Sequence, residues 1–355
     1  MRYFATLHPS QLAALFHQTP QEFRRDTSAD RLALALGATL YAPAVRPHLA
    51  EDIGRCHRAG VMSMVCCLED AIRDEEVGAA ENNLTTQLRR YAAAKPDGPL
   101  LFIRVRTAEQ IRRLADRLGD ELAVVSGFVL PKFRADNEGH DSIEAVRKVG
   151  ADAGLPMYAM PVLETPEVAA AERRVDVLRE LHLLFDSYRE SILALRVGGT
   201  DLCGLYGLRR PADLSAWDIS LLAAVMGDIV NIFGRCDGSG FPVTGPVWEH
   251  FSCKGLAREA RLDRANGLFG KTVIHPAHAS TVHALSVVSH EEYADAAKIV
   301  AGSGGGVLRS EYRNKMNEAG PHRSWAQRTL RRAEIFGVAA AGITSSDFLR
   351  QGVAT

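Results

Sequence analysis

Short runs of apolar residues alternate along this chain with longer segments in which apolar residues recur at helical spacing. Eight runs have the length and the Val, Ile and Leu content of buried strands, and they lie at 35–43, 61–69, 99–106, 126–131, 157–164, 192–199, 240–246 and 271–276. Segments such as 107–123 and 140–154 lie between them and have the period of helices. Apolar strands separated by helices favour a parallel sheet covered on both faces. Eight of them in sequence predict an α/β fold, a closed (β/α)8 TIM barrel.

Two regions fall outside the barrel pattern. Residues 1–33 predict one or two N-terminal helices, and the end of the chain carries further helical segments such as "EEYADAAKIV" and "SWAQRTLRRAEIFGVAA". We therefore expect an N-terminal helical segment at 1–33, a catalytic barrel at 34–290 and a C-terminal helical extension or lid at 291–355. The Gly-rich stretch 301–308 has two interpretations, a hinge for a lid over the barrel mouth or a plain connecting loop.

Composition narrows the class of protein. The chain has 355 residues, 46% of them hydrophobic, with a net charge of −1 and a pI near 6.9, so no global field attracts nucleic acid or an anionic membrane. No apolar run approaches the ~20 residues that span a bilayer, and the N-terminus lacks a cleavable apolar signal. The six cysteines form no CxxC pair and are interpreted as reduced thiols. These features predict a cytoplasmic protein with no nucleic-acid or membrane partner.

Charged and ionisable residues follow most of the predicted strands. Because the active site of a (β/α)8 barrel lies at the carboxyl ends of its strands, these residues are expected to converge on one rim. They are Arg46, Glu69, Asp70, Arg104, Arg106, Lys132, Glu164, Asp201 and His275, whereas Lys271 comes before the last predicted strand.

Glu164 and Asp201 follow consecutive strands and are expected to be neighbours. Two carboxylates with no basic residue between them suit Mg²⁺, which commonly takes one or two carboxylates together with water and substrate oxygens. Gly199 and Thr200, directly before Asp201, allow the backbone to approach a ligand closely. The structural alternative is that Asp201 caps the next helix.

The cations suggest how an anionic substrate would bind. Arg46 and Arg104 suit a carboxylate or phosphate, which a guanidinium binds with two hydrogen bonds. Arg104 is also expected to form an ion pair with Glu69, which would leave Asp70 free to face the pocket as an acid or base. Lys132 has two equal interpretations, a substrate anchor or an ion pair with Glu69 or Glu164.

Several motifs resemble one known family. The order "YAPAVRP", "CLEDAI", "FIRVR", "GFVLPK", "VLET", "GGTDL", "GKTVIHP" and "PHRSWAQRTLRRA", over about residues 38–335, is similar to the citrate lyase β-subunit-like branch of the HpcH/HpaI aldolases. More closely, it resembles a divergent C–C bond lyase subgroup of TIM-barrel fold. The resemblance implies Mg²⁺ or Mn²⁺ on Glu164 and Asp201, substrate at Arg46 and Arg104, and an acid pair in Glu69 and Asp70. It also implies a homo-oligomer, a trimer or hexamer.

The expected reaction is cleavage of a C–C bond in a substrate derived from a 2-oxo acid. One form of this substrate is a 3-hydroxyacyl-coenzyme A thioester of the citryl-CoA or malyl-CoA type. The alternatives are a CoA-independent pyruvate or oxo-acid aldolase and a non-catalytic barrel subunit of a biosynthetic cluster. The chain departs from the family pattern around the first arginine, where "APAVRP" lacks the usual Gly-Asn before Arg-Pro.

Overall fold

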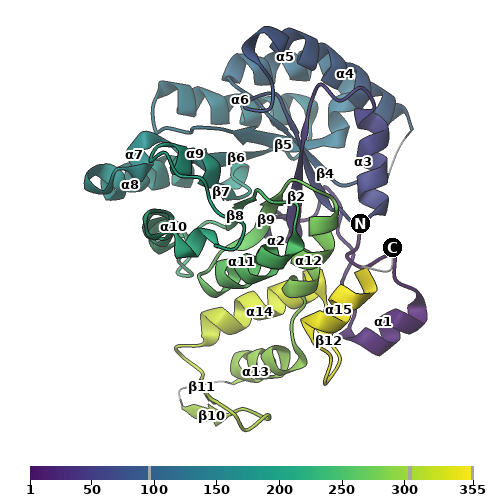
Figure 1. The fold of residues 1–355 in the computed structure, drawn as a ribbon, viewed down its shortest axis with the longest axis vertical. Helices are drawn as coiled ribbons and strands as arrows, with labels where there is room; N and C mark the ends of the chain where they lie inside the picture. Colours follow the sequence, from purple (N-terminus) through teal and green to yellow (C-terminus); the bar gives the residue numbers. More distant parts are fainter. Residues whose placement is uncertain (95–96, 303–305, 353–355) are drawn as a thin grey trace. The chain divides into compact units, whose positions relative to one another are not determined.

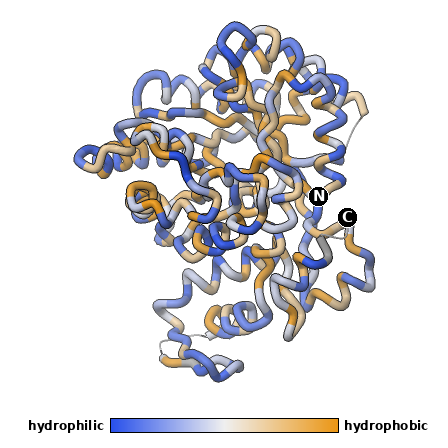
Figure 2. The backbone as a smooth tube through the Cα atoms, in the orientation of Figure 1, coloured by the Kyte–Doolittle hydropathy of each residue, from blue (hydrophilic) through white to orange (hydrophobic). Residues whose placement is uncertain are grey.

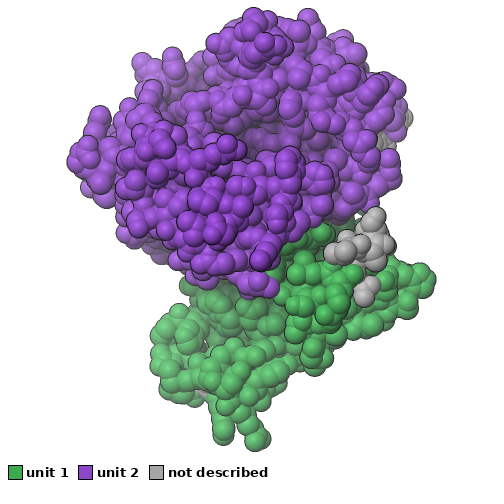
Figure 3. Space-filling view, viewed as in Figure 1, with its two compact units in different colours: residues 1–24, 280–355 green, residues 25–279 purple. Residues whose placement is uncertain are grey.

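The structure is a computed structural model that describes residues 1–94, 97–302 and 306–352. The chain divides into two compact units, one of residues 25–279 and one that combines residues 1–24 with residues 280–355 (Figure 3). The expected three-part domain division stays a prediction, because compactness alone does not show which segments fold independently. Residues 303–305, in the centre of the Gly-rich stretch, lie outside the described residues, so neither interpretation of that stretch is tested.

Eight parallel strands close into a barrel in the larger unit (Figure 1). All eight predicted strands are confirmed, and so is the TIM-barrel fold. The strands follow one another around the barrel in chain order, and the last pairs with the first. They are β2 (Ala38–Pro43), β3 (Ser63–Cys67), β4 (Leu100–Arg104), β5 (Val125–Leu130), β6 (Tyr158–Leu163), β7 (Leu195–Val197), β8 (Val243–Trp248) and β9 (Phe269–Val273).

The strands are apolar on both faces because helices cover the barrel outside and side chains fill it inside. Every residue of β3 and β5 is buried, and hydrophobic stretches run through the interior of the chain trace (Figure 2). The register between β2 and β3 runs without a shift from Thr39 opposite Ser63 to Pro43 opposite Cys67. Paired residues of parallel strands face the same side, so alternate residues of each strand point into the barrel.

Helices follow the strands as the alternation predicts. Local sequence fixes several of their ends: Thr107 accepts a hydrogen bond from the backbone N–H of Gln110 at the start of α5, and Asp136 accepts one from Gly139 at the start of α6. The helices of this part of the chain are α2 (Ala29–Ala35), α3 (Leu49–Arg58), α4 (Val77–Ala93), α5 (Ala108–Leu118), α6 (Asn137–Ala153), α7 (Pro166–Ala169), α8 (Ala171–Ser187), α9 (Gly199–Gly204), α10 (Ser220–Phe233), α11 (Cys253–Ala265) and α12 (Ala277–Ser286). Short 3₁₀ helices occupy Asp74–Glu76, Gly119–Val124, Arg189–Ser191 and Ala216–Asp218.

The smaller unit joins the two ends of the chain. Its β1 pairs with β12 antiparallel, and a buried aromatic group of Tyr3, His283 and Phe336 forms part of its core. The predicted N-terminal and C-terminal helices are confirmed. The elements are α1 (Pro9–Leu15), β1 (Phe16–Gln18), α13 (His290–Ala301), β10 (Val307–Arg309), β11 (Met316–Glu318), α14 (Arg323–Phe336), β12 (Val338–Ala339) and α15 (Ser345–Gly352). Within the described chain, no helix is long and apolar enough to span a membrane.

Candidate active site

Four strand ends place acids and cations within hydrogen-bond distance of one another. Glu69 and Asp70 follow β3, Arg104 ends β4, Lys132 follows β5 and Glu164 follows β6. Their contacts occur at the carboxyl end of a closed parallel barrel, where the side chains after each strand share one rim. We call these five residues the rim cluster.

Arg104 lies at the centre of the rim cluster. Its Nη2 atom is 2.7 Å from Glu69 Oε2, 2.9 Å from Asp70 Oδ2 and 3.2 Å from Glu164 Oε1. The predicted ion pair between Arg104 and Glu69 is therefore confirmed. Asp70 binds the same guanidinium and also Lys132, contacts that the sequence did not predict, and its role as an acid or base stays a prediction. Adjacent residues after a strand can turn toward one pocket once the chain has left the pleat.

Lys132 binds the acids through both its side chain and its backbone. The Nζ atom donates to Glu69 Oε1 at 2.5 Å and to Asp70 Oδ1 at 2.8 Å, while the backbone N–H donates to Glu164 Oε1 at 2.9 Å. A φ of 47°, unusual for a residue with a side chain, makes this double contact possible. Of the two interpretations of Lys132, the structure contains the ion pair with Glu69.

These contacts set the charge states in the cluster. Burial lowers the pKa of Lys132, but hydrogen bonds to Asp70 and Glu69 raise it overall, so the amine stays protonated and does not act as a Schiff-base nucleophile. Burial also raises the pKa of Asp70, but hydrogen bonds with Glu69 and Lys132 and the charge of Arg104 lower it overall. Asp70 is therefore ionised at neutral pH.

Glu164 and Asp201 form the pair expected to hold a metal ion. The pKa of Glu164 is raised overall to about 7, because burial and the negative charge of Asp201 raise it more than the charge of Arg104 lowers it. The backbone between them comes very close, because a Cβ on Gly198 would lie 1.9 Å from Glu164 Oε2. Asp201 is 30% exposed at its side chain, and its nearest cation is Lys132 Nζ at 3.9 Å.

This pair fits a hard divalent cation. The raised pKa of Glu164 shows that its neighbours do not fully offset the cost of burying its charge beside Asp201. A divalent cation that prefers oxygen ligands would stabilise both carboxylates in their ionised form. The described residues contain no group of three or more His, Cys, Asp or Glu side chains arranged to hold a metal. A metal here would therefore have two protein carboxylates and would complete its coordination with water and substrate oxygens, as Mg²⁺ commonly does.

The remaining predicted substrate residues lie apart from the rim cluster contacts. The Nε atom of Arg46 donates to Asp52 Oδ2 at 2.5 Å, and the arginine side chain is 48% exposed. Thr200 donates from Oγ1 to Glu249 Oε1 at 2.7 Å, which connects the first turn of α9, where Asp201 lies, to the residue after β8. Gly199 packs closely against Pro246: a Cβ atom added at Gly199 would lie 2.9 Å from Pro246 Cβ.

Lys271 lies away from the rim, as expected for a residue at the beginning of the last predicted strand. It lies within β9, fully buried, where Nζ donates to Glu259 Oε1 at 2.5 Å and to Asp263 Oδ2 at 2.7 Å. Its neighbour in β2 is Ala38, the first residue of that strand. It therefore belongs to the amino end of the barrel, while His275 after β9 is exposed.

Sequence reasoning missed the buried partners of Lys271. Arg210 Nη1 binds both carboxylate oxygens of Glu259, at 3.1 and 3.0 Å, and Trp217 Nε1 donates to Asp263 Oδ1 at 2.8 Å. We call Arg210, Glu259, Asp263 and Lys271 the basal charge cluster. The acids lie four residues apart on α11, and this spacing on one helix face was the available signal.

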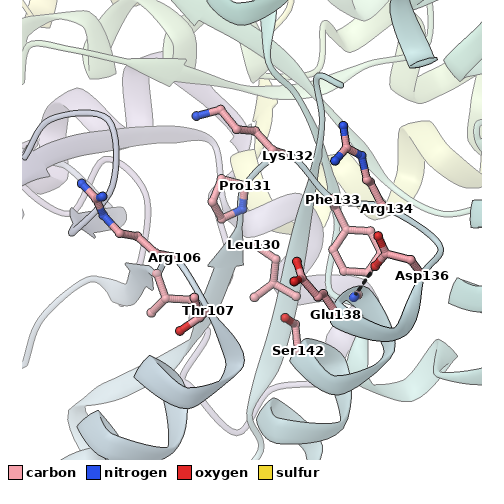
Figure 4. Close-up of a pocket in the computed structure, with 12 residues that line it drawn as sticks. Arg106, Thr107, Leu130, Pro131, Lys132, Phe133, Arg134, Asp136, Glu138 and Ser142 are labelled. Carbon is pink, nitrogen blue, oxygen red and sulfur yellow. Dashed lines mark hydrogen bonds between the residues drawn. The ribbon is translucent and has the colours of Figure 1, made fainter. Parts of the chain in front are cut away.

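A pocket adjoins the rim cluster between the end of β5 and the start of α6 (Figure 4). Lys132 lines it, as does Arg106, which lies in the loop after β4. Arg106 binds Asp74 at 2.5 Å and the carbonyl oxygen of Ile72 at 2.7 Å, so it holds the loop after β3 in place. The pocket is lined by Val105, Arg106, Thr107, Leu130, Pro131, Lys132, Phe133, Arg134, Asp136, Glu138, Gly139 and Ser142.

A closed parallel barrel whose carboxyl rim joins acids and cations in one network is the architecture of a TIM-barrel enzyme. A family model described as C–C bond lyase of the TIM-barrel fold matches residues 30–338. The chain belongs to this family and is a lyase that resembles the citrate lyase β subunit, as the motifs predict. The interpretation as a non-catalytic barrel is therefore wrong. Comparison with curated protein sequences gives no match.

Solved structures share the fold. CitE of Mycobacterium tuberculosis, in complex with magnesium, acetoacetate and coenzyme A, is 24% identical, with a TM-score of 0.55 over 85% of this chain and 99% of that chain. A malate synthase of Haloferax volcanii is 13% identical, with a TM-score of 0.55 over 74% of this chain and 76% of that chain. At these identities the likeness supports the barrel fold and leaves the substrate open.

Proposed function

We propose that this lyase depends on Mg²⁺ or Mn²⁺ and cleaves a C–C bond in a substrate derived from a 2-oxo acid. The observation that carries the proposal is the buried Glu164 beside Asp201, joined through Arg104 to Glu69 and Asp70. Two carboxylates would hold the cation, and a guanidinium beside them would bind the substrate carboxylate. The magnesium in the CitE complex agrees with this assignment.

The metal, when bound, would polarise the 2-oxo group and stabilise negative charge on its oxygen. Arg104 would orient the substrate carboxylate, and Lys132 would keep Asp70 ionised and in place. Ionised Asp70 would take the proton of the substrate hydroxyl as the C–C bond breaks, and this proton would then go to the carbon of the departing enolate; both transfers reverse when the bond forms. Glu69 is a positioning residue, since it holds Arg104 and Lys132 at once.

Calorimetry tests the metal and substrate assignments together. We expect the wild-type protein to bind oxaloacetate in the presence of Mg²⁺ and Glu164→Gln to lose this binding. Glu167→Gln is a matched control three residues further on, because Glu167 pairs with Arg134 at 3.3 Å outside the rim cluster. Absence of binding by the wild-type protein, or equal binding by Glu164→Gln, would refute the proposal.

The two versions of the proposed reaction, one on a CoA thioester and one on a free acid, can be told apart by the substrate that the protein turns over. The CoA thioester is supported by the coenzyme A in the CitE complex, and Arg46 is the residue proposed to bind its second anionic group. Release of free oxo acid from malyl-CoA or citryl-CoA would establish the thioester form. Release of pyruvate from a free hydroxy-oxo acid, with no turnover of either thioester, would establish the other.

We also propose that the chain forms a homo-oligomer, a trimer or hexamer. Light scattering of the purified protein tests this proposal, since a mass of 38.6 kDa would show a monomer.

A further inference from the structure

A guanidinium lies inside the barrel without a carboxylate partner. Arg196, in the middle of β7, is 1% exposed. Its Nη2 atom donates to Thr272 Oγ1 at 2.5 Å, and its Nη1 atom lies 3.8 Å from Met160 Sδ. No acidic side chain of the described residues forms an ion pair with it. Burying a charge in this way destabilises a fold, so another reason for its presence is needed.

Tyr41 covers this guanidinium. Its ring centroid lies 5.5 Å from Arg196 Cζ, in a cation–π contact. Tyr41 is only partly buried, and its hydroxyl makes no hydrogen bond with the described residues. Burial raises the pKa of Tyr41, although the charges of Arg196 and Arg104 lower it, so the hydroxyl keeps its proton at neutral pH.

Strand register places both residues directly beneath the rim cluster. Pro43 pairs with Cys67, and Cys67 pairs with Arg104, so these three residues share the inward face. Tyr41 is two residues before Pro43 and points the same way. Arg196 pairs with Val162, which is two residues before Glu164. Tyr41 and Arg196 thus occupy the layer of inward side chains below Arg104 and Glu164.

We propose that Tyr41 and Arg196 form the floor of the active site and make it selective for anionic substrates. The Tyr41 hydroxyl donates a hydrogen bond to an oxygen of the bound 2-oxo carboxylate. Arg196 is a positioning residue: it holds the ring from below and supplies the positive charge that a buried carboxylate needs. The inference deepens the proposed function and rests on it.

Tyr41→Phe tests the hydrogen bond. With Mg²⁺ present, we expect calorimetry to show about tenfold weaker binding of oxaloacetate, because a hydrogen bond to a charged group is lost. The melting temperature should stay within about 2 °C of the wild type, since the ring and its cation–π contact remain. Tyr158→Phe, at the first residue of β6, is the control and should bind as the wild type does. Equal affinity of Tyr41→Phe and wild type would overturn the assignment.

Arg196→Met separates a positioning role from a structural one. We expect it to leave the melting temperature unchanged or raise it, since it removes an uncompensated buried charge, while oxaloacetate binding weakens about tenfold or more. Arg196→Lys keeps the charge and should recover part of the affinity. A lower melting temperature with unchanged affinity would show that Arg196 only supports the fold.

The two proposals fail in different ways. If the wild-type protein binds no oxaloacetate with Mg²⁺, the proposed function itself fails. If the wild type binds it and Glu164→Gln does not, while Tyr41→Phe binds as the wild type does, the metal site stands and the floor assignment is wrong.

Discussion

Replacing Glu259 by glutamine should cost more stability than any exposed ion pair of this protein contributes. Glu259 accepts hydrogen bonds from Arg210 Nη1 at 3.0 and 3.1 Å, from Lys271 Nζ at 2.5 Å and from the backbone N–H of Ala216 at 2.7 Å. The side chains of Glu259, Arg210 and Lys271 are at most 2% exposed, so water does not screen them. Glutamine keeps the size and removes the charge.

The expected loss follows from the unpaired cations. With Glu259 neutral, Asp263 remains as a partner of Lys271, and Arg210 has no carboxylate. Removing one partner of a buried ion pair costs about 3–5 kcal/mol. For a unit of this size, that loss lowers the melting temperature by roughly 6–20 °C. Urea unfolding followed by circular dichroism gives the free energy of unfolding directly.

Arg258→Gln is the matched control, because Arg258 is the preceding residue on the same helix. It forms an ion pair with Asp218, and the two side chains are 53% and 26% exposed. An exposed pair contributes about 0–1 kcal/mol. If Glu259→Gln unfolds as easily as Arg258→Gln, or loses less than about 1 kcal/mol, the reasoning about the basal charge cluster is refuted.

Three further predictions concern a histidine, a glycine and a helix cap. Burial lowers the pKa of His283 to about 3, below its ordinary value of 6.5. The unfolded chain therefore binds a proton that the fold excludes, and stability should fall as the pH drops below about 6.5, by about 1.4 kcal/mol per pH unit; urea unfolding of His283→Leu should lack this slope. Gly198→Ala should abolish Mg²⁺ binding in calorimetry, because the new Cβ would meet Glu164 Oε2 at 1.9 Å, whereas Gly204→Ala, with nothing within 4 Å, should bind normally. Thr107→Ala removes the N-cap of α5 and should cost about 1 kcal/mol in urea unfolding, and an unchanged midpoint would contradict it.

The barrel could be predicted because its signals are local. A buried parallel strand needs apolar residues on both faces, and most of the strands from β2 to β9 carry them, with Arg196 in β7 and Lys271 in β9 as charged exceptions. The motifs after the strands also indicated the lyase family, which the match over residues 30–338 confirms. The rim location of Glu69, Asp70, Arg104, Lys132 and Glu164 could also be predicted, because the carboxyl ends of parallel strands all lie at the same end of the barrel.

Pairing among these residues could not be predicted in the same way. Asp70 was expected to face the pocket, but its contact with Lys132, a residue with a φ of 47°, was not predicted. A lysine in the sequence does not indicate a positive φ at its position. Lys271 was expected at the beginning of the last strand, and its pairing with Ala38 confirms this, but its buried partners on α11 were not predicted.

The sequence by itself determined the number and order of strands, the end of the barrel that carries the chemistry and the family. These depend on periodicity and on residue types close together in the chain. Only the tertiary structure decided which charges meet: the basal charge cluster, the three acids around Arg104, and the unpaired Arg196 beneath Tyr41. Such contacts join residues far apart in the chain, as in the cation–π contact between Tyr41 and Arg196, which lie 155 positions apart. They depend on strand register and rotamer, for which no short stretch of sequence carries a signal.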